Sequence, residues 1–207
     1  MSNPHFVTQL FEQQLCEYTG APFAVAVNSC TMALTLAVAW HLRNAQHERW
    51  DYRFEVTIPK RTYVSVPQAI IHAGGRPVFD DCLWLGSYQL LPLPVWDSAR
   101  YFSKAMYWAG RFVCVSFHAS KTLGLEQGGA ILHDNAEADA WFRRARFDGR
   151  AEGVAPKDDA GIIMGWHCYL NPSTAAQGIL KLHSLPKFNA PLPNDDYPDL
   201  STLECFR

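Results

Sequence analysis

Residues 112–129, FVCVSFHASKTLGLEQGG, constrain the fold of this chain more than any other segment. They begin with a short Val-rich run, typical of a buried parallel strand, and end in a Gly-Gly pair before a second apolar run. Lys121 follows the first run, and strand ends in open α/β sheets are where ligands bind. A partly desolvated lysine there loses its proton more easily and becomes a nucleophilic amine. Taken alone, Lys121 would favour the simpler interpretation of a solvated loop lysine.

Apolar runs and helical periodicity alternate on both sides of this segment. Before it, the pattern predicts helices at 8–18, 32–42 and 64–72 and strands at 23–28, 55–59 and 76–80. After it, we expect a strand at 130–133, a helix at 136–147, a loop at 151–165 and a last helix at 172–185. Strands that alternate with helices form βαβ units, which predicts an α/β domain with a mostly parallel sheet and right-handed crossovers.

A second candidate binding element follows the first predicted strand. Asn28, Ser29, Cys30 and Thr31 lie between this strand and the apolar helix expected at 32–42. Free backbone N–H groups and the dipole of a helix N-terminus attract anions, so this arrangement predicts an anion site. Ser29 or Thr31 could instead serve only as the N-cap of the helix, which is the commoner use of such residues.

Composition narrows the class of protein. The 207 residues are 48 % apolar, enough for a full hydrophobic core, and their net charge of −2 argues against a nucleic-acid arm or a polybasic membrane patch. The six cysteines form no C-x-x-C pair, as in a reduced cytoplasmic protein. The histidines show no metal-binding spacing, no apolar run reaches the length of a membrane span, and MSNPHF has no signal-peptide pattern. We therefore expect a cytoplasmic protein without a metal site.

Four segments, in the same order, resemble the DegT/DnrJ/StrS sugar aminotransferase family. FEQQLCEYTGAPFAVAVNSCTMALTLAV resembles the family's N-terminal helix, first strand and Ser-Gly-Thr loop, and VTIPKRTYVSVPQAIIHAGGRPVFDD resembles its next βαβ unit. PVWDSAR resembles its Glu-Asp-x-Ala segment, and VSFHASKTLGLEQGGAILHDN its Ser-Phe-His-x-x-Lys…Gly-Gly segment. Four matches in order are far more specific than one. The resemblance implies a three-layer αβα large domain of fold type I that uses pyridoxal 5′-phosphate (PLP).

The resemblance also implies a role for each matching residue. Lys121 would form a Schiff base with PLP and then act as the proton-shuttling base. Asp97 would pair with the pyridine nitrogen and keep it protonated. Ser29, Thr31 and Ser116 would bind the phosphate with help from backbone N–H groups of the loop after Asn28, and Cys30 in that loop would also belong to the cofactor site. Tyr63 would stack on one face of the ring and Ala99 would pack on the other, while His118 would contact the cofactor or only orient the lysine loop.

Several residues depart from the family pattern. Cys30 replaces a glycine, which leaves the backbone approach to the phosphate in doubt. Arg100 replaces the usual His or Gln near the cofactor's phenolic oxygen, to which an arginine can still donate. Gln127 replaces Glu before the Gly-Gly pair, and residues 167–169 replace an Asn/Arg segment that reaches into the partner subunit's site.

The chain is shorter than the family pattern in two places. Residues 82–96 are too few for another complete strand–helix crossover, so we expect the sheet to lack one of the family's seven strands. Leu90, Leu91 and Leu93 would cover any gap. We also expect the family's C-terminal small domain to be missing, so the resemblance implies a minimal PLP-binding domain at 1–185 and an irregular Pro-rich tail at 186–207.

These features predict a PLP-dependent aminotransferase-like enzyme that transfers an amino group from an amino acid to a keto-sugar-like or other carbonyl acceptor. Two alternatives stay open: a PLP-dependent lyase, decarboxylase or aldolase acting on an amino-acid-derived substrate, and a non-catalytic remnant that binds a partner. The presence of both Lys121 and Asp97 favours an enzyme. Because family sites are completed by a second subunit, the resemblance also implies a homodimer, with no nucleic-acid or membrane partner.

Overall fold

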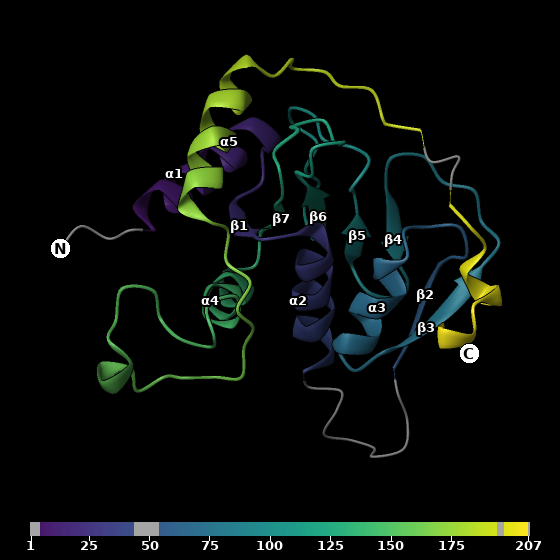
Figure 1. Cartoon of the computed structure of the whole chain (residues 1–207), viewed down its shortest axis with the longest axis horizontal. Coiled ribbons are helices and arrows are strands. Elements are labelled where there is room, and N and C mark those ends of the chain that lie inside the picture. Colours follow the sequence, from purple (N-terminus) through teal and green to yellow (C-terminus); the bar gives the residue numbers. More distant parts are fainter. Residues whose placement is uncertain (1–4, 44–53, 194–196, 207) are drawn as a thin grey trace.

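The computed structural model describes residues 5–43, 54–193 and 197–206. Helices cover both faces of a central sheet, so the domain has three layers (Figure 1), and the expected α/β architecture is confirmed. α1 and α5 pack together on one face, and α2, α3 and α4 lie on the other. In chain order, the helices and strands are α1 (Phe6–Thr19), β1 (Phe23–Val27), α2 (Cys30–Leu42), β2 (Glu55–Pro59), α3 (Ser65–His72), β3 (Arg76–Asp80), β4 (Tyr88–Leu90), β5 (Val95–Asp97), β6 (Phe112–Ser116), β7 (Gly129–His133), α4 (Ala136–Ala145) and α5 (Pro172–Ser184).

The side chains of the central strands alternate between two hydrophobic cores. In β1, Val25 and Val27 belong to the core under α2, whereas Ala24 and Ala26 belong to the core under α1 and α5. Burial on both faces explains why these strands read as unbroken apolar runs. Similarly, α2 is apolar on nearly all sides because it is buried between the sheet, α3 and α4.

The sheet differs from the mostly parallel arrangement that the sequence predicted, because it is mixed. Its strand order is β1-β7-β6-β5-β4, in which β5 and β6 are parallel and the other neighbours are antiparallel. β2 and β3 pair in parallel, as expected of a βαβ unit, but they form a separate two-stranded sheet. The difference arises because residues 117–128 return the chain from β6 to its neighbour β7 without a helix, and a direct return makes a pair antiparallel.

Residues 88–97 form a hairpin where the family pattern has a crossover. Tyr88 in β4 lies opposite Asp97 in β5, and the pair is antiparallel. Leu91 and Thr57 in β2 exchange two backbone hydrogen bonds, of 2.8 and 3.0 Å, so β4 joins the central sheet to the β2–β3 pair. The prediction that no complete crossover fits here is confirmed. Within the described residues the central sheet has five strands, which agrees with the expectation of fewer than seven, and the strand that ends at Asp97 pairs directly with β4 because an antiparallel return needs only a tight turn.

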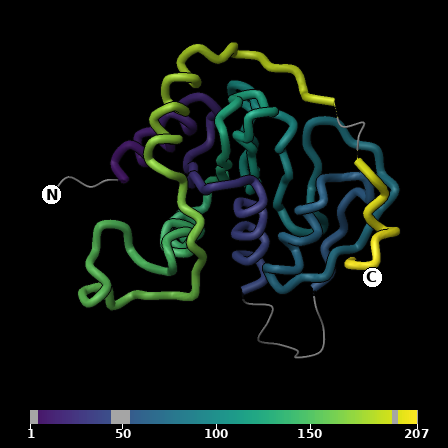
Figure 2. The backbone as a smooth tube through the Cα atoms, viewed as in Figure 1, coloured from purple at the N-terminus to yellow at the C-terminus, as the bar shows by residue number. Residues whose placement is uncertain are grey.

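The C-terminal segment runs across the molecule from α5 to the side of β2 and β3 (Figure 2). Within the expected tail at 186–207, residues 194–196 and 207 lie outside the described residues, and the others contain two short 3-10 turns, η3 (Leu200–Thr202) and η4 (Glu204–Phe206). Asn189 Nδ2 donates hydrogen bonds to Tyr18 Oη (3.0 Å) and to the Phe102 carbonyl oxygen (3.1 Å), and Leu200 is fully buried. The segment is irregular but packed.

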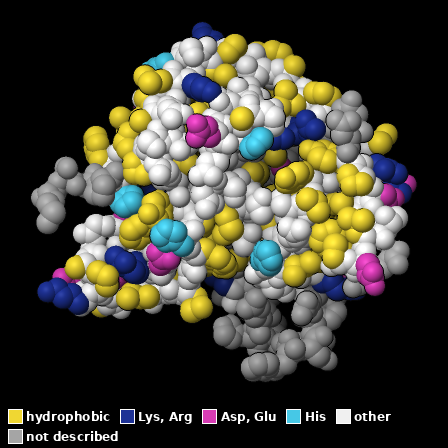
Figure 3. All heavy atoms as spheres, viewed as in Figure 1, with side chains coloured by type: hydrophobic (Ala, Val, Ile, Leu, Met, Phe, Trp, Pro, Cys, Tyr) yellow, Lys and Arg dark blue, Asp and Glu magenta, His cyan; other side chains and the backbone are white. Residues whose placement is uncertain are grey.

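Charged side chains are scattered singly or in small groups on the face shown in Figure 3. Hydrophobic side chains gather instead over the side of the molecule that carries α3. This uneven surface bears on the assembly proposed below.

Candidate active site

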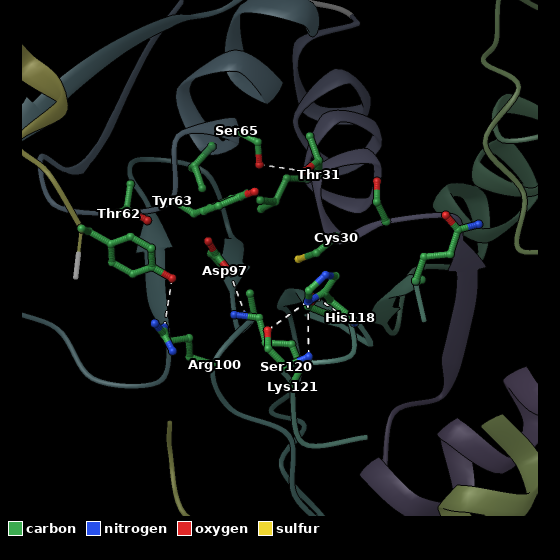
Figure 4. Close-up of a pocket in the computed structure, with 18 of the residues that line it drawn as sticks. Cys30, Thr31, Thr62, Tyr63, Ser65, Asp97, Arg100, His118, Ser120 and Lys121 are labelled. Carbon is green, nitrogen blue, oxygen red and sulfur yellow. Dashed lines mark hydrogen bonds between the residues drawn. The ribbon is translucent and has the colours of Figure 1, made fainter. Parts of the chain in front are cut away.

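A cavity of about 320 Å³ lies where the carboxyl ends of β5 and β6 face the N-termini of α2 and α3 (Figure 4). Because β5 and β6 are parallel neighbours, their last residues, Asp97 and Ser116, meet at one edge of the sheet. The structure brings all ten predicted site residues to this pocket: Ser29, Cys30, Thr31, Tyr63, Asp97, Ala99, Arg100, Ser116, His118 and Lys121. Their roles toward a ligand stay predictions.

Asp97 is buried and fixed by two hydrogen bonds. Tyr88 Oη donates to Oδ2 and the Ala99 N–H donates to Oδ1, each over 2.9 Å. Tyr88 Oη in turn lies 2.6 Å from Thr62 Oγ1, so three elements fix the position of the carboxyl group. Burial raises the pKa of Asp97 above its ordinary value, and the two donors and Lys121 offset this only in part. A cationic ligand group next to Asp97 would relieve this destabilisation of the carboxylate.

Lys121 lies on the loop after β6 and is half-buried. Its backbone N–H donates to the His118 carbonyl oxygen over 2.8 Å, which closes a tight turn, whereas Nζ has no hydrogen-bond partner among the described residues. Burial and the charge of Arg100 lower the pKa of Lys121, and Asp97 opposes this shift. A lowered pKa leaves more of the amine in its neutral, nucleophilic form.

His118 makes its contacts within the lysine loop. Its Nδ1 lies 2.9 Å from Ser120 Oγ and 3.3 Å from the Ser120 backbone nitrogen. These contacts support the second of its two predicted roles, the orientation of the loop that carries Lys121.

The N-terminus of α2 forms the opposite wall of the pocket. Ser29 is the N-cap of α2, because its Oγ accepts a hydrogen bond from the Met32 N–H over 3.2 Å, and it also lines the pocket. Thr31 Oγ1 lies 2.7 Å from Ser65 Oγ at the start of α3. Ser29 can therefore cap the helix and still face a ligand, so the two interpretations of this segment do not exclude each other.

Cys30 occupies its family-glycine position without strain. It is the first residue of α2 and its φ is not positive. A glycine is required instead at Gly129, whose backbone packs closely against the start of α2. A Cβ on Gly129 would lie 2.6 Å from the Cys30 backbone nitrogen. Burial, and secondarily the charge of Asp97, raises the pKa of the Cys30 thiol well above its ordinary value, so this cysteine is not a reactive thiolate.

The aromatic side of the pocket contains two residues, Trp84 and Tyr197, that were not predicted from the sequence. Tyr63, predicted to stack on a cofactor ring, is 57 % exposed, and its neighbours there are Trp84 and Tyr197. Trp84 comes from the loop before β4 and Tyr197 from the C-terminal segment, and no local pattern indicates that either residue reaches the site. The remaining lining residues that the prediction did not include are Asn28, Leu34, Thr62, Ser65, Val66, Ser120, Gln127 and Gly128.

Residues 6–85 and 98–191 match the DegT/DnrJ/EryC1/StrS aminotransferase family. The chain belongs to this family. The unmatched residues 86–97 coincide with the β4–β5 hairpin, so the family match breaks off where the structure departs from the expected crossover, and Asp97 lies just outside it.

Individual relatives agree with this assignment. The spore coat polysaccharide biosynthesis protein SpsC of Bacillus subtilis (strain 168) is 42 % identical over 73 residues, which are 35 % of this chain and 17 % of SpsC. The structure of the sugar aminotransferase CalS13 from Micromonospora echinospora matches with a TM-score of 0.70 at 18 % identity, over 86 % of this chain and 60 % of CalS13. PseC of Helicobacter pylori, an aminotransferase involved in the biosynthesis of pseudoaminic acid, matches with a TM-score of 0.67 at 20 % identity, over 86 % of this chain and 57 % of PseC. The chain thus shares the fold of CalS13 and PseC, and it spans less than two thirds of the length of each of the three relatives.

The described residues contain no group of three or more His, Cys, Asp or Glu side chains arranged to hold a metal ion. No described helix combines the length and the apolar character needed to cross a membrane.

Proposed function

We propose that the chain binds PLP in this pocket and works as an aminotransferase-like enzyme, moving an amino group from an amino acid to a keto-sugar-like or other carbonyl acceptor. The observation that carries the proposal is the placement of Lys121 and Asp97 at adjacent strand ends, in one pocket opposite the N-terminus of α2. Bound PLP would supply an aldehyde and an electron-accepting pyridinium ring.

The donor set of the pocket fits this cofactor. The hydroxyl groups of Ser29, Thr31 and Ser116 and the first N–H groups of α2 suit a phosphate. Asp97 is the sole carboxylate among the described lining residues, and its buried position suits a protonated pyridine nitrogen. Lys121 Nζ, which no described residue binds, suits a Schiff base with the aldehyde.

The side chains of the pocket would then each have a separate role in the reaction. Lys121 would take a proton from one position of the substrate and return it at another, and its lowered pKa favours the basic form that this needs. Thr62 and Tyr88 would keep Asp97 oriented toward the ring nitrogen. Tyr63 and Ala99 would confine the ring between them, and Arg100 would donate to an anionic oxygen near Lys121.

The relatives support a sugar-related acceptor. SpsC is named for polysaccharide biosynthesis, CalS13 for sugar amination and PseC for pseudoaminic acid biosynthesis. The β4–β5 hairpin favours a second candidate, because Asp97 at its end lines the pocket and the hairpin lies where the family match is interrupted. That candidate is a PLP-dependent lyase, decarboxylase or aldolase acting on an amino-acid-derived substrate.

An absorbance experiment tests the proposal. The purified chain with PLP should develop a visible band, and borohydride should remove the band and attach the cofactor to the peptide that contains Lys121. Candidate amino acids should bleach the band and release the matching keto acid if the chain transfers amino groups. Carbon dioxide or a cleaved aldehyde in place of the keto acid would identify the second candidate. No visible band at saturating PLP, or a label on another lysine, would refute PLP binding through Lys121.

The proposal includes a homodimer with the pocket near its interface, in the cytoplasm. Exposed apolar side chains support the dimer: Tyr63 and Val64 lie beside the pocket, and Ile162 and Met164 lie on the loop after α4. The six unpaired cysteines suit a reducing compartment. Sedimentation at micromolar concentration should give a dimer, and a monomer that still holds PLP would contradict this part of the proposal.

A further inference from the structure

The C-terminal segment supplies a residue to the pocket from outside the family match. The match ends at residue 191, whereas Tyr197 lines the cavity with the predicted site residues. This part of the wall therefore belongs to this chain rather than to the pattern that identifies its family.

Tyr197 contacts both Arg100 and the aromatic side of the pocket. Arg100 Nε donates a hydrogen bond to Tyr197 Oη over 3.0 Å, and the guanidinium carbon lies 5.1 Å from the centre of the Tyr197 ring. The ring lies nearly parallel to that of Trp84, with 6.0 Å between centres, and 6.4 Å from the ring of Tyr63. Figure 4 shows the bond to Arg100 on the same side of the pocket as Thr62. One side chain thus fixes a cation and completes an aromatic wall.

The chain directly after Tyr197 is tied to the exit loop of β2. Lys60 Nζ lies 3.2 Å from Asp199 Oδ2, and the Leu200 N–H donates to the Lys60 carbonyl oxygen over 2.8 Å. The Leu200 side chain is fully buried. Because these contacts do not involve the Tyr197 side chain, a substitution at Tyr197 leaves the segment attached.

Arg100 is the cation that acts on Lys121. Burial and then the charge of Arg100 lower the pKa of Lys121. By contrast, the cations Lys60 and Arg61 on the neighbouring loop face Asp199. The other titratable or charged groups on or around the lysine loop are Asp97, Cys30, His118, Tyr63 and Tyr197 in the pocket, Glu126 on the loop itself, and Lys181, which donates to the Gly124 carbonyl oxygen.

We propose that Tyr197 is a positioning residue of this pocket, which holds Arg100 beside Lys121. The C-terminal segment thereby forms part of the functional site. The benefit to catalysis rests on the proposed function. The placement of Arg100 by Tyr197 does not depend on the proposed function, so it can be tested in the protein without cofactor.

The test measures how readily Lys121 reacts with a trace amine reagent. The cofactor-free full-length chain is acetylated with limiting acetic anhydride across a range of pH, and mass spectrometry of the Lys121 peptide gives the titration curve of its amine. Tyr197→Phe keeps the ring but removes the hydroxyl that accepts from Arg100. A freed Arg100 spends less time near Lys121, so the pKa of Lys121 should rise by roughly half a unit.

Three controls make the result specific. Phe188→Ala removes an aromatic ring that is 76 % exposed and lies on the same segment away from the pocket, and it should leave the Lys121 curve unchanged. Arg100→Gln should raise the pKa of Lys121 at least as much as Tyr197→Phe. In the Arg100→Gln background, Tyr197→Phe should add nothing, because the residue through which it acts is gone.

Two results would overturn the inference. One is an unchanged Lys121 curve in a folded Tyr197→Phe protein. The other is an equal shift with and without Arg100, which would show that Tyr197 acts by another route. Failure of the wild-type protein to bind PLP would refute the proposed function while leaving this measurement decisive, so the two failures are distinguishable.

Discussion

Two groups of charged side chains in this molecule differ in how their charges are paired. One lies between α1 and α4, where the fully buried Arg146 binds Glu12 and Glu152 and donates to the Ala26 carbonyl oxygen over 2.7 Å. Arg143 adds a 2.8 Å ion pair with Glu12. The other group is Asp97, Lys121 and Arg100 in the pocket, where no ion pair joins the three residues within the described part of the chain.

The pKa shifts show what this difference means. Burial alone would raise the pKa of Glu12, but Arg146 and Arg143 outweigh it, so the pKa lies below its ordinary value. In the pocket, burial prevails: it raises the pKa of Asp97 and lowers that of Lys121. The first group has satisfied its charges internally and stabilises the fold. The pocket keeps charged groups that hydrogen bonds hold in place but that no ion pair within the described residues neutralises, and a charged ligand can supply that pairing.

The largest effect is expected from removing a charge in the pocket. Asp97→Asn removes the charge that would keep a ring nitrogen protonated, so turnover should fall by roughly a thousandfold or more. PLP should remain bound, because Lys121 and the α2 N-terminus are untouched. Steady-state assays and the visible absorbance of the same samples provide the measurement. A variant with near-normal turnover would exclude Asp97 from the chemistry.

The next largest effect, on the free energy of unfolding, is expected from removing a charge in the buried group between α1 and α4. Arg146→Met leaves Glu12 with one cation fewer in a buried place, which should lower the free energy of unfolding by about 3–5 kcal/mol. Arg76→Met is the matched control, because Arg76 pairs with Glu55 at the surface, and it should cost less than about 1 kcal/mol. Urea titration of both variants gives the two values. Equal losses would contradict the special position of Arg146.

The pH dependence of stability sharpens the same comparison. Because the pKa of Glu12 is lower in the folded chain than its ordinary value of 4.5, its contribution to stability is present above pH 4.5. That contribution is lost as the pH falls through the lower, folded value. The free energy of unfolding from urea titrations should therefore drop as the pH falls below about 4.5, with a shallower drop in Glu12→Gln. Parallel curves for the two proteins would show that Glu12 does not titrate on unfolding.

The smallest expected effect on stability is at Lys121. Lys121→Met removes a half-buried amine whose Nζ binds no described residue, so the free energy of unfolding should change by less than about 1 kcal/mol. Borohydride should then attach no cofactor to the 112–129 region. A loss of several kcal/mol in urea titration would mean that Lys121 is a structural residue.

The sequence predicted most of this site because its residues sit on short, local patterns. Asp97 ends β5 and Lys121 follows its parallel neighbour β6, so their strand ends lie together. Ser29 follows β1, which runs in the same direction as β6 on the other side of β7. The hairpin at β4 and the Glu12–Arg146 pair were not foreseen. The hairpin is local, but its strands, β4 and β5, have only three residues each, too few to show an alternating pattern. The ion pair joins residues that lie 134 positions apart in the chain, and no periodic pattern encodes such a contact. Tyr197 escaped prediction for the same reason, since an irregular Pro-rich segment carries no signal of where it packs.

A crystal structure of the full chain grown with PLP tests most directly whether the charged groups of the pocket are reserved for this cofactor. The account predicts continuous electron density from Lys121 Nζ to the cofactor, the pyridine nitrogen within hydrogen-bonding distance of Asp97, and the phosphate at the N-terminus of α2. A cofactor bound elsewhere, or one in this pocket whose ring nitrogen points away from Asp97, would contradict it.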